Sequence, residues 1–294
     1  MNIWQKTKHF SELVAFEHTV FSAAFILVAM VVASLQKHAG IWFGFPTLLL
    51  CALALISARN FAMGFNRLVD RDIDVLNERT KNRPSVDGRI STTPLAVFCA
   101  FNAMIFIITS HYINDLAFYL SLPFLLILGG YSFTKRFSSM AHIVLGLSLG
   151  LAPIAGCIAV LGVIEFWCLA LCIAVMFWVA GFDLLYSLQD IEFDSKHHLH
   201  SIPTRFGVKV TLYISRIFHL CAVVFWAFFI SQAKVLGIVS YVGLGICALM
   251  LIYEQYLVYK DFKNIPRAFF TTNGYLGFVF FTFIILDGGL HYGI

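Results

Sequence analysis

Long apolar segments alternate with short polar ones along the chain, and each apolar segment has about the length that crosses a lipid bilayer. An α-helix needs about 20 apolar residues to span the hydrocarbon core. The pattern therefore predicts about nine membrane-spanning helices. The segments run approximately from 14 to 35, 42 to 64, 95 to 112, 116 to 133, 141 to 163, 166 to 188, 211 to 232, 235 to 258 and 269 to 288.

Composition supports this interpretation. Hydrophobic residues make up 60% of the 294 residues and charged residues only 12%, whereas soluble domains contain about 25% charged residues. No linker rich in Pro, Gly or Ser divides the chain, and no soluble domain is visible. We therefore predict an all-α polytopic membrane bundle that forms a single domain over residues 1–294 and has the lipid bilayer as its surroundings.

The basic residues predict how the chain is oriented. Lys and Arg collect in cytoplasmic loops, and with nine spans 18 of the 20 Lys and Arg residues fall on one side, leaving Lys37 and Lys234. This places the amino terminus in the cytoplasm and the carboxyl terminus outside. The same bias accounts for the formal net charge of +4, so the charge indicates no nucleic-acid partner.

Two stripes of polar residues begin where long apolar segments end. The first advances in steps of four, and each step turns a helix by about 400°, so its members share one face. A proline and basic residues follow each stripe, and we predict two similar half-bundles that meet at one central cavity, although transporters also contain such repeats. The first stripe is Asn66, Asp70 and Asp74, and the second is Asp183, Tyr186, Asp190 and Asp194.

The stripes suit a site for a divalent metal ion and a diphosphate. An ionised Asp at mid-membrane costs about 2.5–3.5 kcal/mol on insertion scales, so several are placed together only where water, metal or partner groups receive them. Carboxylate and amide oxygens are ligands for Mg²⁺, which also retains waters and binds substrate phosphate oxygens. Neighbouring Arg and Lys would stabilise the charge on a leaving diphosphate. The alternative is a solvated charged rim at the helix ends.

Several motifs resemble those of the UbiA superfamily of intramembrane prenyltransferases. Two long motifs, each an acidic stripe with the basic segment that follows it, lie at the separation seen in that family, and two shorter motifs accompany them. The similarity spans nearly the whole chain. The matching segments are Asn66–Asp74 with Arg79–Pro84, Gly181–Asp194 with Ser201–Gly207, Tyr131–Arg136 and Phe16–Phe21.

This resemblance implies a bundle of nine membrane helices, dependence on Mg²⁺, and transfer of a polyprenyl group from polyprenyl diphosphate to an aromatic acceptor. The chain is most similar to the 4-hydroxybenzoate polyprenyltransferase group of ubiquinone biosynthesis, including its menaquinone-pathway homologues. We expect it in the bacterial inner membrane, with the active site facing the cytoplasm. One departure stands out: many members have Asp after the first Asn, where this chain has Arg67, which removes one potential ligand and adds a positive charge.

The expected site residues fall into three groups. Asp70, Asp190 and Arg136 are the catalytic candidates, and Asp190 would help to deprotonate or orient a phenol. Arg59, inside an apolar run, would bind phosphate or an acceptor carboxylate, or else pair with an acid. Metal ligands are expected at Asn66, Asp70, Asp74, Asp183, Asp190 and Asp194, and substrate contacts at Arg59, Lys81, Arg83, Lys135, Arg136 and Tyr186.

Three other functions are compatible with parts of this pattern. A haem O synthase-like enzyme would use the same diphosphate chemistry on a porphyrin acceptor. A cation-coupled transporter would bind ions at two acidic stripes, but transporter sites lie near the midplane of the bilayer, whereas these stripes lie at the ends of the spans. A membrane scaffold would leave the duplicated stripe unexplained.

Overall fold

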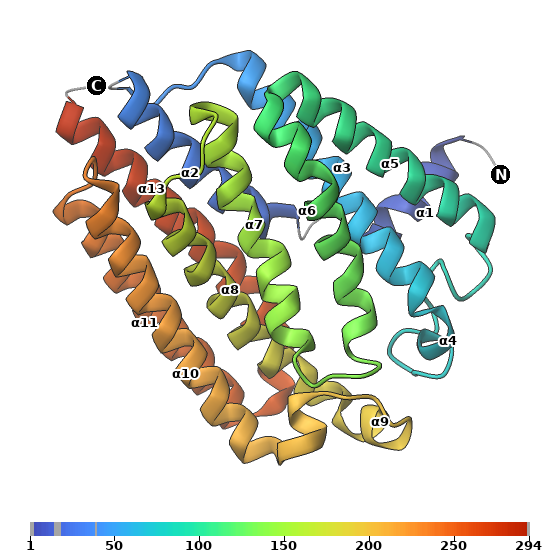
Figure 1. Cartoon of the computed structure of the whole chain (residues 1–294). Coiled ribbons are helices and arrows are strands. Elements are labelled where there is room, and N and C mark those ends of the chain that lie inside the picture. Colours follow the sequence, from blue (N-terminus) through green and yellow to red (C-terminus); the bar gives the residue numbers. More distant parts are fainter. Residues whose placement is uncertain (1–2, 15–18, 39, 293–294) are drawn as a thin grey trace. The chain divides into compact units, whose positions relative to one another are not determined.

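The chain is helical in a computed structural model, which describes residues 3–14, 19–38 and 40–292 (Figure 1). No β-strand occurs among these residues. Residues 16–18 of the predicted Phe16–Phe21 motif lie outside the described part of the chain. The main helices are α1 (Ile3–Val14), α2 (Thr19–His38), α3 (Phe45–Val69), α4 (Arg71–Asp74), α5 (Thr92–Ile113), α6 (Asp115–Thr134), α7 (Ala141–Leu161), α8 (Phe166–Ser187), α9 (Ile191–Lys196), α10 (Ile202–Ala233), α11 (Ile238–Lys260), α12 (Ile265–Arg267) and α13 (Asn273–Tyr292).

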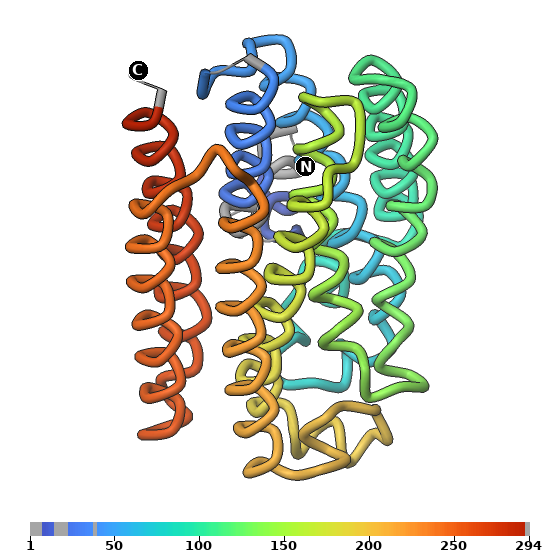
Figure 2. The backbone as a smooth tube through the Cα atoms, turned by 60° about the vertical axis from the view of Figure 1, so that its left-hand side comes forward, coloured from blue at the N-terminus to red at the C-terminus, as the bar shows by residue number. Residues whose placement is uncertain are grey.

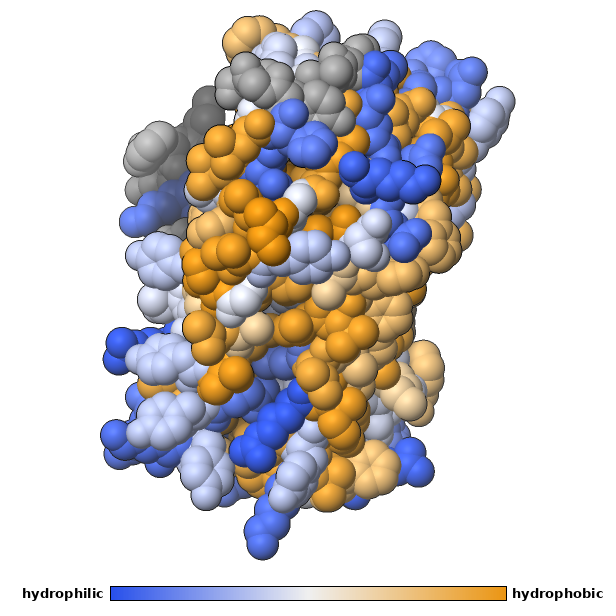
Figure 3. All heavy atoms as spheres, turned by 90° about the vertical axis from the view of Figure 1, so that its left-hand side faces the viewer, coloured by the Kyte–Doolittle hydropathy of each residue, from blue (hydrophilic) through white to orange (hydrophobic). Residues whose placement is uncertain are grey.

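The prediction of an all-α membrane bundle is confirmed. Within the described residues, eight helices are long and apolar enough to cross a membrane, and α2 contributes a shorter apolar helix over Ala23–Lys37. Each of the nine predicted spans therefore overlaps a helix. Figure 3 shows hydrophobic side chains across the middle of one face and hydrophilic side chains towards its two ends. This distribution is the one that a multi-pass membrane protein requires.

Helix α10 begins nine residues before the span predicted from position 211. Ser201 accepts a hydrogen bond from the backbone N–H of Thr204, the Thr204 side chain accepts one from the backbone N–H of Ser201, and Pro203 lies in the first turn. This capping box satisfies backbone donors at the helix start. At Gly207 the backbone leaves helical geometry with φ 77° and ψ 170°, a conformation that favours glycine. The residues from Ile202 to Gly207 thus form a short capped segment that precedes the predicted apolar span.

The helices form two compact units. Unit 1 consists of Met1–Thr19 and Leu49–Phe133, and unit 2 of Val20–Leu48 and Thr134–Ile294. Unit 1 thus contains α1, most of α3, and α4 to α6, whereas unit 2 contains α2 and α7 to α13. The first acidic stripe belongs to unit 1 and the second to unit 2.

In unit 1, helix α3 packs closely against α5 and α6. A Cβ atom added at Gly64 of α3 would lie 2.9 Å from the Sγ atom of Cys99 in α5. Ala54, Phe106 and Leu125 contribute one buried apolar cluster from the three helices. This packing supports the carboxyl end of α3, where the first acidic stripe begins.

In unit 2, helix α8 is the central element, with α7 and α10 packed against it (Figure 2). In the most apolar stretch of the membrane segment that contains α8, 72% of the residues are buried. Small residues allow the close approach of α7: a Cβ atom at Gly146 would lie 2.3 Å from the carbonyl oxygen of Met176. The second stripe starts on α8, so this interface determines where its first carboxylate lies.

A buried polar chain joins α8 to α11 and α13. The Nε1–H group of Trp178 donates to Oδ1 of Asn273 over 2.8 Å, and the Nδ2 group of Asn273 donates to Oε1 of Glu254 over 2.8 Å. Asn273 directly follows a π-helical turn, η4, over Ala268–Thr272. Buried polar groups are costly unless they are hydrogen-bonded. These two hydrogen bonds therefore hold the π-helical turn beside α8.

Replacing Gly146 with alanine should destabilise unit 2, because the methyl group would collide with the backbone of α8. We expect a loss of about 1–3 kcal/mol, typical of overpacking, and a lower thermal midpoint in detergent. Gly245→Ala on α11 is the matched control, because no atom lies within 4 Å of the added Cβ; it should be neutral or slightly stabilising. Equal midpoints for the two variants would contradict the close-packing account.

Candidate active site

The first acidic stripe lies at a break between two helices. Helix α3 ends at Val69 and α4 begins at Arg71, with Asp70 between them. Hydrogen bonds at four-residue spacing nevertheless cross the break: the Asp70 N–H group donates to the Asn66 carbonyl and the Asp74 N–H group to the Asp70 carbonyl, each over 2.8 Å. The stripe thus keeps its spacing without a continuous helix, and Asp70 and Asp74 are only 3% and 4% exposed.

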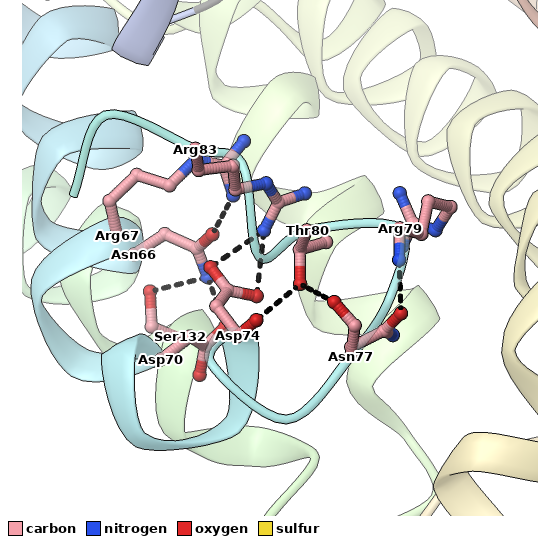
Figure 4. A network of polar contacts seen from close by, with 9 residues as sticks. All are labelled: Asn66, Arg67, Asp70, Asp74, Asn77, Arg79, Thr80, Arg83 and Ser132. Atoms are coloured by element: carbon pink, nitrogen blue, oxygen red, sulfur yellow. Dashed lines mark hydrogen bonds and ion pairs between the residues drawn. The ribbon is translucent and has the colours of Figure 1, made fainter. Parts of the chain in front are cut away.

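Arg83 neutralises Asp74 from the loop that follows α4 (Figure 4). Its Nη1 atom donates to both carboxylate oxygens of Asp74, over 2.7 Å to each. The hydroxyl of Thr80 donates to the Asp74 carbonyl over 2.9 Å, and the Asn77 side chain accepts from the backbone N–H of Arg79 over 2.9 Å. Thr80 and Asn77 therefore fold the loop so that Arg83 returns to the helix end.

Asn66 links Asp70 to a second arginine. Its Nδ2 group donates to Oδ2 of Asp70 over 2.8 Å, while its Oδ1 atom accepts from Nη1 of Arg67 over 3.0 Å. The Nδ2 group also lies 3.5 Å from Oγ of Ser132 on α6. Among the described residues, unit 1 thus brings together all three members of its stripe, together with Arg83.

Other predicted substrate contacts in unit 1 differ in their surroundings. Arg59 lies within α3, and its side chain is partly buried. Lys81 forms an ion pair with Glu78, three residues away, and both side chains are exposed, at 46% and 86%. Lys81 therefore has a local surface partner, whereas Arg83 is turned into the polar network.

The second stripe is divided among three elements. Asp183 and Tyr186 belong to α8, Asp190 ends the 3₁₀ turn η2 (Leu188–Asp190), and Asp194 lies on α9. Asp183 contacts a residue that sequence analysis did not single out: its Oδ2 atom lies 2.6 Å from Nδ1 of His142 at the start of α7. His142 is 4% exposed. An isolated histidine in an apolar segment was the only signal that could have indicated it.

Tyr186 forms part of an aromatic cluster with the π-helical turn η4. Its ring centroid lies 4.4 Å from that of Phe269, and Phe269 makes an edge-on contact with Phe182 at 5.1 Å. Sequence analysis did not assign Phe269 a role, because one phenylalanine among 31 has no distinguishing sequence signal. Aromatic faces stabilise nearby cations, so the cluster supplies surroundings suited to a carbocation.

The basic pair Lys135–Arg136 lies between α6 and α7. The carbonyl of Lys135 accepts a hydrogen bond from the N–H group of His200 over 2.8 Å, and the carbonyl of Asp194 accepts from Leu199 over 2.9 Å. The first bond connects the α6–α7 loop with the segment before α10, and the second lies within the segment that follows α9. A pocket of about 490 Å³ in this region is lined by Phe137, Ser138, Ser139, His200, Thr204 and Arg205.

The acidic residues fit Mg²⁺ by their chemistry, since carboxylates are the hard oxygen donors that this ion prefers. Among the residues that the structure describes, no group of three or more Asp, Glu, His or Cys side chains is placed so that it could hold a metal ion. Mg²⁺ is often bound by one or two carboxylates together with waters and substrate phosphates.

Comparisons with known proteins point to one family. The model of the UbiA prenyltransferase family matches residues 22–284. A 4-hydroxybenzoate octaprenyltransferase of Vesicomyosocius okutanii is 29% identical over 252 residues, which cover 84% of this chain and 91% of that protein. The apo structure of a UbiA homologue from Aeropyrum pernix has a TM-score of 0.82 at 30% identity and covers 92% of this chain and 98% of its own.

A further solved structure shares the fold at lower identity. A UbiA homologue from Archaeoglobus fulgidus, bound to DMAPP and Mg²⁺, has a TM-score of 0.70 at 21% identity, with 97% of this chain and 99% of that chain covered.

Arg83→Ala should destabilise unit 1, because it leaves the buried Asp74 carboxylate without its guanidinium. Breaking a buried pair costs about 3–5 kcal/mol. Since the Arg83 side chain is 25% exposed, we expect a smaller loss of about 1–3 kcal/mol, measured by thermal unfolding in detergent. Lys81→Ala is the control for an exposed pair and should cost under about 1 kcal/mol. If adding Asp74→Asn did not recover part of the Arg83→Ala loss, the pairing account would be wrong.

Proposed function

The chain belongs to the UbiA prenyltransferase family, and on this premise we propose that it transfers a polyprenyl group from polyprenyl diphosphate to an aromatic acceptor. The acceptor would be 4-hydroxybenzoate or a related hydroxynaphthoate of ubiquinone or menaquinone biosynthesis. The observation that carries the proposal is the buried network of Asp70, Asp74 and Arg83 at the end of a membrane helix. The bacterial 4-hydroxybenzoate octaprenyltransferases to which the chain is similar support the choice of acceptor class.

We propose that residues 1–294 form one catalytic domain in the bacterial inner membrane, with the active site on the cytoplasmic side. The distribution of Lys and Arg supports this orientation, because 18 of the 20 lie on the side where both acidic stripes begin. Bacterial relatives support the choice of membrane. A diphosphate made in the cytoplasm would then reach the site without crossing the bilayer.

The proposed cofactor is Mg²⁺, held by carboxylates of the two stripes. When bound, it would act as a Lewis acid that neutralises charge on the diphosphate oxygens. The predicted ligands are Asn66, Asp70, Asp74, Asp183, Asp190 and Asp194. Asp74 pairs with Arg83 and Asp183 with His142 in the structure.

Basic side chains would bind the leaving diphosphate. The candidates are Arg83, Lys135 and Arg136, with Arg59 and Lys81 in addition. As the allylic C–O bond breaks, its electron pair leaves with the diphosphate, and these cations stabilise the charge that develops there. Arg136 is exposed and is thus accessible to an anionic substrate.

The remaining steps concern the prenyl carbocation and the acceptor ring. Tyr186, whose ring is tilted against that of Phe269, would stabilise the cation through its ring face and help to exclude water, which would otherwise quench it. A ring carbon of the acceptor forms the new C–C bond and then loses its proton. Asp190 would orient the phenol or accept its proton. The isoprenoid tail would extend along apolar surface into the lipid.

The function is tested by incubating the purified protein with Mg²⁺, a polyprenyl diphosphate, and a panel of 4-hydroxybenzoate, dihydroxynaphthoates and haem B. We expect a prenylated hydroxybenzoate or naphthoate, identified by mass, and loss of product when EDTA replaces Mg²⁺. Product formed from haem B alone would instead favour the haem O synthase-like alternative. The absence of product with every acceptor would contradict the proposed transfer.

Asp70→Asn and Asp190→Asn should each lower prenyl transfer at least a hundredfold, because an amide cannot replace a carboxylate that binds the metal. Their thermal midpoints in detergent should stay near that of the wild type. Matched controls are Asp72→Asn and Glu192→Gln, which change exposed acidic residues of the same motifs and should retain activity. Wild-type turnover in both Asp70→Asn and Asp190→Asn would remove the acidic stripes from the mechanism.

A further inference from the structure

Asn273 is a fully buried residue at the start of α13 that no step of the proposed mechanism uses. We infer that Asn273 is a positioning residue: it holds the π-helical turn η4 so that Phe269 covers Tyr186, and it thereby keeps water away from the prenyl cation. This inference rests on the proposed function, because the cation is formed only in the proposed transfer. The placement of Phe269 itself does not depend on catalysis.

The Asn273 amide is hydrogen-bonded at both of its ends. An indole N–H group can only donate a hydrogen bond, so the amide oxygen faces Trp178, at 2.8 Å. The amide nitrogen then faces Oε1 of Glu254, at 2.8 Å, and the carbonyl of Ala268, at 3.3 Å. Asn273 and Glu254 are both 0% exposed. One buried side chain therefore joins α8 and α11 to the first residue of the π-helical turn.

The aromatic residues of α8 follow the same line of contact. Trp178, Phe182 and Tyr186 are each four residues apart and so share one face of the helix. Asn273 binds Trp178, the first of the three. Phe269 precedes Asn273 by four residues and contacts the other two, at ring-centroid distances of 5.1 Å and 4.4 Å. The bond to Trp178 therefore sets the register of η4 along α8 and places Phe269 against Tyr186.

The π-helical turn needs such a restraint. Its hydrogen bonds span one residue more than those of an α-helix, and such turns are rare and often lie at functional sites. Aromatic rings pack against one another in several offset arrangements, so the contacts of Phe269 alone do not specify one register. The buried hydrogen bonds do, because a slip of one residue would leave Trp178 and Glu254 without their partner away from water.

The position of Phe269 matters because the proposed cation has two fates. Attack by a ring carbon of the acceptor forms a C–C bond and releases a proton, whereas attack by water forms a C–O bond, releases a proton and yields the prenyl alcohol. Tyr186 and Phe269 are partly exposed, whereas Phe182 is 3% exposed. The two partly exposed rings therefore form the outer part of the aromatic cluster, and displacing Phe269 would admit water beside Tyr186.

The first test measures how the cation is divided between these fates. The purified protein in detergent receives Mg²⁺, a polyprenyl diphosphate and the acceptor that the wild type prenylates, and the ratio of prenyl alcohol to prenylated acceptor is determined by mass. We expect Asn273→Leu to raise this ratio roughly fivefold, the factor that one net hydrogen bond contributes. Glu254→Met should raise it less, whereas Glu254→Gln keeps an acceptor oxygen for Asn273 and should leave it unchanged.

Asp287→Ala is the matched control for a general loosening of α11 and α13. Asp287 is 4% exposed and accepts from the backbone N–H groups of Gly237 and Ser240, over 2.6 Å and 3.0 Å, at the opposite end of α11 from Glu254. Its loss should lower the thermal midpoint, as Asn273→Leu does, without changing the product ratio. An equal rise of the ratio in both variants would assign the effect to loosening and overturn the inference.

The second test measures the placement of Phe269 without turnover. 4-Fluorophenylalanine in place of Phe269 gives one fluorine resonance, and Tyr186→Leu supplies the chemical shift expected when the ring contact is lost. We expect Asn273→Leu and Glu254→Met to move or broaden this resonance, and Glu254→Gln and Asp287→Ala to leave it in place.

Either an unmoved resonance or an unchanged product ratio in both Asn273→Leu and Glu254→Met would overturn the inference. If Asn273→Leu does not fold, Glu254→Met decides both measurements, because it leaves the bonds of Asn273 to Trp178 and Ala268 in place. A wild-type enzyme that was inactive on every acceptor would contradict the proposed function, while the fluorine resonance would still test whether Asn273 positions Phe269.

Discussion

The balance of charge at the ends of membrane helices is the constraint on which the candidate site depends. Asp70 and Asp74 are almost completely buried, and a buried carboxylate is tolerated only when a cation or several donors receive it. Arg83 meets this need for Asp74, Asn66 donates to Asp70, and His142 contacts Asp183. The positions of these partners determine where the carboxylate groups of Asp70, Asp74 and Asp183 lie.

Close packing of the helices holds these paired side chains in fixed positions. Gly64 in unit 1 and Gly146 in unit 2 let neighbouring helices approach so closely that a Cβ atom would collide with the facing helix. In lipid, close contact of small residues replaces the hydrophobic effect as a source of helix association. In unit 2 the chain from Trp178 through Asn273 to Glu254 adds buried hydrogen bonds. Rigid helices then carry the polar side chains to defined places.

The breaks in the helices have a functional consequence. A continuous α-helix would satisfy its own backbone groups and keep the stripe residues in one row. Instead, α3 stops at Val69 and α8 stops at Ser187. Arg83 follows in the loop after α4, and Arg205 follows in the first turn of α10. The chain can therefore combine an acidic row with cations from sequence positions further along. Diphosphate chemistry needs both, because a cluster of acids alone would repel the substrate.

The sequence alone was sufficient for the helical membrane fold, because a run of about 20 apolar residues has few stable alternatives in a bilayer. It also predicted that Asn66, Asp70 and Asp74 lie close together, since residues four apart on a helix are neighbours. The proposed roles of all the site residues remain predictions.

Only the tertiary structure decided the partners that come from distant segments. His142 reaches Asp183 because α7 packs on α8, and Phe269 contacts Tyr186 because a π-helical turn lies beside the end of α8. Sequence analysis treated Arg67 as a lost ligand, whereas the structure turns its guanidinium onto the Asn66 oxygen. Hydrophobic periodicity specifies that a helix forms and where it ends. Which side chains meet across two helices depends on how their faces interlock, and that is a property of the packed structure.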